Sequence, residues 1–143
     1  MNVIPENILT RMDPGDRAKL PKEVRSTAAE RQTVAVSRLE REMHNGFSSW
    51  LNLRKQFFGF VHTNPVRKST IKKGFPDFTV LHHGRVLLIE FKVPPNGLTP
   101  DQKDVFHELS VSGNQIYVCT TLEDAIHLTI EYFNLPPGWK EIA

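Results

Sequence analysis

The feature that most constrains this chain is the stretch VLLIEFKV at residues 86–93, where four apolar residues run directly into a glutamate. A continuous apolar run of this length is typical of a strand covered on both faces, so it predicts a central strand. A carboxylate in such a strand is costly without a partner. Because side chains alternate along a strand, Lys92 shares a face with Glu90, and Phe91 points into the opposite layer. The partner of Glu90 is therefore either Lys92, as a buried pair, or a bound cation.

The other apolar patterns predict helices and strands around this strand. Residues 99–102 (TPDQ) combine an N-cap threonine with a glutamine at the capping-box position, and His83-Gly84 suits a tight hairpin turn. The pattern predicts an α/β domain: a mixed central β-sheet flanked by helices, with a right-handed βαβ step. The expected elements are a helix at 28–53, strands at 57–64, 77–83 and 86–93, a helix at 99–112, a buried strand at 115–120 and a helix at 121–133.

Length and composition bound the domain organisation. The 143 residues, 39% of them apolar, suit one compact domain. Residues 1–27 lack sustained periodicity and predict a partly irregular arm with at most one short helical turn. We expect the domain itself at 28–135, followed by an irregular tail at 136–143.

Signals for the membrane and for secretion are not apparent in the sequence. No apolar run approaches the ~20 residues that cross a bilayer, and the N-terminus does not resemble a secretory signal. Cys119 is the only cysteine, so a disulfide within the chain is impossible. These features predict no membrane partner and a reducing, cytoplasmic location.

Charge is distributed unevenly along the chain. Residues 43–76 carry six Lys or Arg and no acid, whereas residues 77–143 carry four Lys or Arg and nine acids. This asymmetry suits a protein that holds a polyanion on one surface and binds cations at another, although a solvated basic loop is an equal alternative. The candidate phosphate contacts are Lys72, Lys73, Arg67 and Lys68.

Two carboxylates meet in the predicted hairpin. Asp77 opens one strand and Glu90 lies near the end of its partner, so both fall at the open end, away from the His83-Gly84 turn. Two carboxylates there would repel each other unless a cation joined them, and Mg²⁺ is commonly held by one or two carboxylates with water and phosphate oxygens. The Lys92 ammonium, on the same face, could stabilise charge that develops on a phosphoryl group.

Three motifs carry a resemblance to a known family: GFPD at 74–77, IEFK at 89–92 and GLTPDQ at 97–102. Together they resemble the PD-(D/E)XK nuclease superfamily, and more narrowly its virus-type replication–repair nuclease (VRR-NUC) family, over residues 36–125. The resemblance implies a restriction-endonuclease-like core. It also implies Asp77 and Glu90 as metal ligands with the Phe91 carbonyl, Lys92 as the catalytic lysine, and Gln102 as the polar residue at a helix start.

The same resemblance implies a glutamate on the first helix that faces the metal. The string LEREM at 39–43 offers two candidates, Glu40 and Glu42. Glu40 is favoured because related resolvase-like nucleases use the first acid of such a string.

By resemblance, the chain would be a Mg²⁺- or Mn²⁺-dependent endonuclease that hydrolyses DNA phosphodiester bonds. Some family members cut branched DNA or Holliday junctions as homodimers, and compact members occur in phages and prophages, where they serve DNA replication and repair. Two alternatives remain open. One is a catalytically silent nucleic-acid-binding or host-interaction module that keeps the fold, and the other is a nuclease acting on RNA or on a nucleotide messenger.

Overall fold

The structure, a computed structural model, describes residues 4–21, 27–63 and 72–140. The chain divides into two compact units, Met1–Arg38 and Leu39–Ala143. The first unit holds the short helices α1 (Glu6–Leu9) and α2 (Pro14–Ala18), where the sequence predicts at most one helical turn. The long helix α4 (Ala28–Asn52) begins in this unit and continues into the second. Within the described ranges, no helix is both long and apolar enough to span a membrane.

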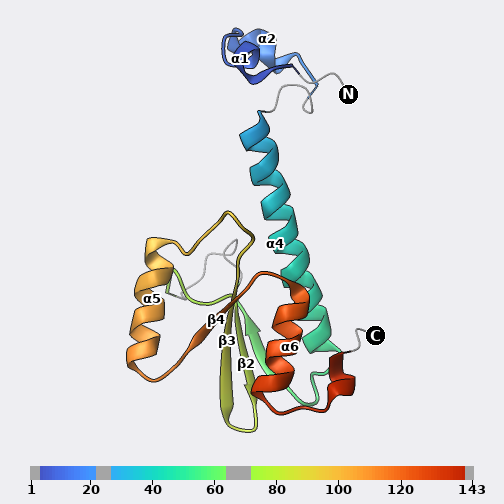
Figure 1. Cartoon of the computed structure of the whole chain (residues 1–143), viewed down its shortest axis with the longest axis vertical. Coiled ribbons are helices and arrows are strands. Elements are labelled where there is room, and N and C mark those ends of the chain that lie inside the picture. The colour runs from blue at the N-terminus through green and yellow to red at the C-terminus, as the bar shows by residue number, and fades with distance from the viewer. Residues whose placement is uncertain (1–3, 22–26, 64–71, 141–143) are drawn as a thin grey trace. The chain divides into compact units, whose positions relative to one another are not determined.

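A four-stranded mixed sheet forms the centre of the second unit. Its strands are β1 (Gly59–His62), β2 (Phe78–His82), β3 (Arg85–Phe91) and β4 (Ile116–Cys119), in the spatial order β1-β2-β3-β4. The first three strands pair antiparallel, and β4 pairs parallel to β3. Helix α5 (Pro100–Val111) connects β3 to β4 on one side of the sheet, and α6 (Leu122–Tyr132) lies on the other side (Figure 1). The predicted α/β fold with a mixed sheet is confirmed.

Strand β3 is internal, as its apolar run predicts, and its last five residues are buried. The hairpin turn before it is also confirmed, because His83 and Gly84 both have positive φ angles, 46° and 74°. The prediction of a buried strand at 115–120 is wrong in part. Strand β4 lies at the edge of the sheet, and Val118 is 46% exposed there.

Successive side chains of β3 point to opposite faces of the sheet, so only one set of them enters the main hydrophobic core. Leu87, Ile89 and Phe91 belong to the main hydrophobic core, in which residues of α4 and α6 also take part. The intervening side chains, Leu88 and Glu90, therefore point to the side of α5. The core members contributed by α4 and α6 are Phe47, Trp50, Leu51, Ala125, Ile126 and Ile130.

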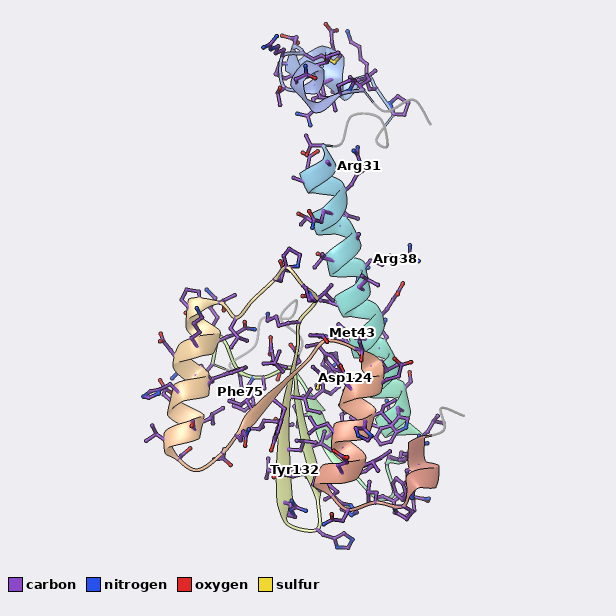
Figure 2. The ribbon with its side chains drawn as sticks, in the orientation of Figure 1. Arg31, Arg38, Met43, Phe75, Asp124 and Tyr132 are labelled. Atoms are coloured by element: carbon purple, nitrogen blue, oxygen red, sulfur yellow. The ribbon has the colours of Figure 1, made fainter. Side chains whose placement is uncertain are left out.

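The C-terminal tail is anchored in this unit by its 3₁₀ helix, η1 (Pro137–Lys140), where the sequence predicts irregular chain. The Trp139 ring packs edge-on against Phe57 with centroids 4.7 Å apart, and its carbonyl accepts a hydrogen bond from Trp50 Nε1 at 3.2 Å. On α6, Tyr132 (labelled in Figure 2) donates its hydroxyl hydrogen to the Val86 carbonyl at 2.7 Å. These contacts join the tail to α4, and α6 to β3.

Candidate active site

Asp77 and Glu90 meet across the β2–β3 hairpin. Phe78 pairs with Ile89 in the antiparallel register, so the next residues at the open end are Asp77 on one strand and Glu90 on the other. Asp77 Oδ2 accepts a hydrogen bond from the Phe91 N–H at 2.8 Å. The backbone of β3 thus ties the Asp77 carboxylate directly beside Glu90.

The Glu90 carboxyl group is buried and only half satisfied. Its side chain is 2% exposed, and Oε1 accepts hydrogen bonds from Lys92 Nζ at 3.1 Å and from Gln102 Nε2. Its other oxygen, Oε2, is buried without a hydrogen-bond partner among the described residues. The pKa of Glu90 is raised to about 7, first by burial and then by the Asp77 charge, while Lys92 and a backbone hydrogen bond from Asp77 oppose the rise only in part. The Glu90–Lys92 pair is therefore present, but it does not compensate for the buried charge.

Gln102 serves two partners with one amide group. Its Oε1 accepts a hydrogen bond from the Thr99 N–H at 2.9 Å, which completes the capping box of α5, while its Nε2 donates to Glu90. Gly74 allows this approach. Its φ angle is +89°, and a Cβ at this position would lie 2.5 Å from the Asp101 carbonyl. The glycine of the GFPD motif thus lets the start of α5 pack against the loop before Asp77.

The residue of α4 that contacts Asp77 is His44, which sequence reasoning missed. His44 Nε2 lies 3.2 Å from Asp77 Oδ2. The predicted acid, Glu40, lies one helical turn earlier on the same face and is half-buried, whereas Glu42 is exposed. Within residues 27–63 and 72–140, the side-chain hydrogen bonds and ion pairs of Asp77 and Glu90 do not involve Glu40. The sequence did carry a signal for His44, because it follows Glu40 by four residues and so lies on the same face of the helix.

A second histidine stands behind the first. His62 Nε2 lies 3.2 Å from His44 Nδ1, and the His62 ring stacks on Phe78 with centroids 4.3 Å apart. Burial lowers the pKa of His62, and the nearby His44 lowers it further, more than Asp77 raises it. His62 is thereby favoured in its neutral form.

The predicted phosphate contacts fall into two groups. Lys72 and Lys73 are exposed and form ion pairs with acids of α5, Lys72 with Glu108 and Lys73 with Asp101 at 2.7 Å. Arg67 and Lys68 lie outside the described residues. Phosphate binding by the two described lysines would have to compete with these surface ion pairs, which are individually weak.

The residues at this site fit a hard divalent cation. One buried Glu90 oxygen has no hydrogen-bond partner in the described part of the chain, and the neighbouring Asp77 charge disfavours ionisation of Glu90 in the absence of a cation. Within the described ranges, no three His, Cys, Asp or Glu side chains gather into a full ligand set. Mg²⁺ does not need one, because it binds through one or two carboxylates and completes its shell with water and other oxygens.

The family model of the VRR-NUC domain matches residues 26–122. The chain belongs to the VRR-NUC family. The match runs from just before α4 to the start of α6, so it contains the whole sheet and every side chain of the site, and the predicted family is confirmed. A VRR-NUC domain is a nuclease of the PD-(D/E)XK type, a class that acts on DNA and generally uses divalent metals. No curated protein gives a significant match to the chain.

Proposed function

We propose that this VRR-NUC domain is an endonuclease that hydrolyses DNA phosphodiester bonds with Mg²⁺ or Mn²⁺ at the site formed by Asp77, Glu90 and Lys92. The observation that carries the proposal is the Glu90 carboxyl group, which is buried beside a second carboxylate and has one oxygen with no hydrogen-bond partner among the residues that the structure describes. A buried carboxyl of this kind is costly to folding, and such costs concentrate at functional sites.

Asp77 and Glu90 would hold the cation through carboxylate oxygens, together with the backbone carbonyl of Phe91. These are hard oxygen donors, which suit Mg²⁺ and Mn²⁺ better than softer metals. A bound divalent cation supplies Lewis acidity and lowers the pKa of a coordinated water. Glu40, one turn from His44 on α4, could contribute through a bridging water.

Lys92 would act on the phosphoryl group. Its ammonium lies 3.1 Å from Glu90 Oε1, and its side chain is 15% exposed, so its charge is weakly screened by solvent. A fixed positive charge at this point stabilises negative charge that develops on phosphate oxygens. Gln102 would hold Glu90 Oε1, leaving the other carboxylate oxygen to the cation.

The finer parts of the proposal rest on the resemblance to known family members. We propose that the substrate is branched or Holliday-junction DNA, that two copies act as a homodimer, and that the protein serves phage or prophage DNA replication or repair in the bacterial cytoplasm. Lys72 and Lys73, with Arg67 and Lys68, would bind phosphates along the DNA backbone.

Cleavage assays test the proposal. Purified protein is incubated with Mg²⁺ or Mn²⁺ and a panel of linear, flapped and four-way DNA together with RNA. We expect cleavage of DNA that is abolished by chelation, by Asp77→Ala and by Lys92→Ala, and preserved in Lys103→Ala, an exposed lysine on α5. Cleavage that persists in Asp77→Ala or Lys92→Ala would refute the assignment of the site.

The same panel separates the rival functions. Binding of DNA without cleavage of any substrate would favour a silent binding module, and cleavage of RNA alone would favour an RNA nuclease. A nucleotide messenger is tested by adding cyclic dinucleotides to the panel. Light scattering at the assay concentration tests the homodimer, because a strict monomer would contradict paired cleavage of a junction.

A further inference from the structure

His44 and His62 form a hydrogen-bonded chain that ends on the Asp77 carboxylate. His62 Nε2 lies 3.2 Å from His44 Nδ1, and His44 Nε2 lies 3.2 Å from Asp77 Oδ2. A neutral imidazole has one N–H donor and one acceptor nitrogen. With both rings neutral, one assignment satisfies both contacts: His62 donates to His44 Nδ1, and His44 donates from Nε2 to Asp77.

The aromatic core fixes the orientation of both rings. His62 stacks on Phe78 with an interplanar angle of 3°, and His44 meets the same ring edge-on, with centroids 5.8 Å apart at 81°. His44 also packs on Phe91 with centroids 5.5 Å apart. Phe78 and Phe91 are at most 1% exposed, so the two imidazoles rest on a rigid surface.

The pair of histidines contacts one particular oxygen of Asp77, Oδ2. Oδ2 accepts from the Phe91 N–H at 2.8 Å and contacts His44 Nε2. Both of the contacts that described residues make with this carboxylate fall on Oδ2, so Oδ1 is left for a further ligand. Rotation of the carboxylate would break both contacts at once.

We propose that His44 is a positioning residue that fixes the Asp77 carboxylate so that its second oxygen remains available to the divalent cation, and that His62 sets the tautomer of His44. The inference rests on the proposed function, because it assigns the pair to the cation site. Groups that support a ligating side chain in this way are worth about 10- to 100-fold in metal affinity.

The test measures Mg²⁺ and Mn²⁺ affinity by isothermal titration calorimetry, independently of cleavage. We expect His44→Ala to weaken the binding of both cations by about 10-fold or more, and His44→Gln, whose amide can still donate to Asp77, to restore most of the loss. His62→Phe keeps an aromatic ring on Phe78 but removes the N–H, and we expect a smaller loss. His107→Ala, at an exposed histidine on α5, is the matched control and should bind like wild type.

A double variant tests whether His62 acts through His44. His44→Ala combined with His62→Phe should bind no more weakly than His44→Ala alone, because the second change acts on a contact that is already lost. Additive losses would overturn the role of His62. Near-ultraviolet circular dichroism of each variant verifies that the aromatic core is intact.

Three outcomes overturn the role of His44. One is unchanged cation affinity in His44→Ala, and another is a failure of His44→Gln to restore binding. The third is a loss for Mn²⁺ but not for Mg²⁺, which would mark His44 as a direct ligand, because imidazole suits transition metals. If Asp77→Ala abolishes binding while His44→Ala does not, the inference alone fails. Absence of cation binding in wild type would overturn the proposed function as well.

Discussion

Replacing Glu90 with glutamine should change how stability depends on pH in cation-free protein. Burial and the Asp77 charge raise the pKa of Glu90 from an ordinary value of 4.5 to about 7. Between these values the folded protein holds a proton that the unfolded chain has released. The free energy of unfolding therefore falls as pH rises through this window and levels off above it. At about 1.4 kcal/mol for each pH unit, the full decline is about 3 kcal/mol.

Glu90→Gln keeps the shape of the side chain and removes its titration. The difference in free energy of unfolding between the variant and wild type at pH 4.5 serves as the reference. We expect this difference to shift by about 3 kcal/mol in favour of the variant at pH 8, because only wild type loses stability over this range. Urea unfolding in the presence of a chelator measures this, with fluorescence of the fully buried Trp50 as the probe. Glu123→Gln, an exposed change on α6, is the matched control and should follow the wild-type curve.

Adding a divalent cation extends the same experiment to function. A cation that binds the ionised site stabilises the folded state according to its concentration and dissociation constant, so Mg²⁺ or Mn²⁺ should recover stability at pH 8 in wild type. Glu90→Gln should respond weakly, since it has lost one of the two charges. Parallel pH curves for wild type and Glu90→Gln would refute the reasoning about the buried carboxyl group.

Two further predictions concern packing around the site. Gly74→Ala places a Cβ on a residue with a positive φ angle and within 2.5 Å of the Asp101 backbone, so we expect the free energy of unfolding in urea to fall by about 2–4 kcal/mol. The control is Gly97→Ala, which has open space around it and should change the free energy of unfolding by less than about 0.5 kcal/mol. Tyr132→Phe removes the hydrogen bond to the Val86 carbonyl and should cost about 1 kcal/mol by the same measurement; an unchanged value would mean that water replaces this contact.

Much of the fold follows from local sequence patterns. Both ends of the helix at 100–111 are predicted by local sequence signals. Thr99 and Gln102 form the capping box at its start, and Gly113, at a φ of +88°, follows its last turn. The hairpin follows from His83-Gly84, and the meeting of Asp77 with Glu90 follows from counting residues on either side of that turn. Each of these features depends on residues that are close in the chain.

Long-range packing limits what the sequence can predict. The contact of His44 with Asp77 depends on the rotation of α4 against the sheet, which no local pattern specifies. The exposure of Val118 has a similar cause, because an apolar run does not tell an edge strand from a central one. The packing of Trp139 depends on partners that lie more than eighty residues earlier in the chain. The C-terminal segment that carries it therefore shows no local pattern that predicts its structure.

The amide of Gln102 restricts the choice of amino acid at this position more than either of its contacts does alone. A capping box accepts glutamate as readily as glutamine, because both side chains offer an oxygen to the Thr99 N–H. Glutamate, however, would bring a third carboxylate against Glu90 and Asp77, while an apolar residue would leave the Thr99 N–H without the side-chain oxygen that it binds in the capping box. Helix capping and the hydrogen bond to Glu90 therefore both favour glutamine at residue 102, and a substitution there would disturb the start of α5 and the environment of the Glu90 carboxyl group together.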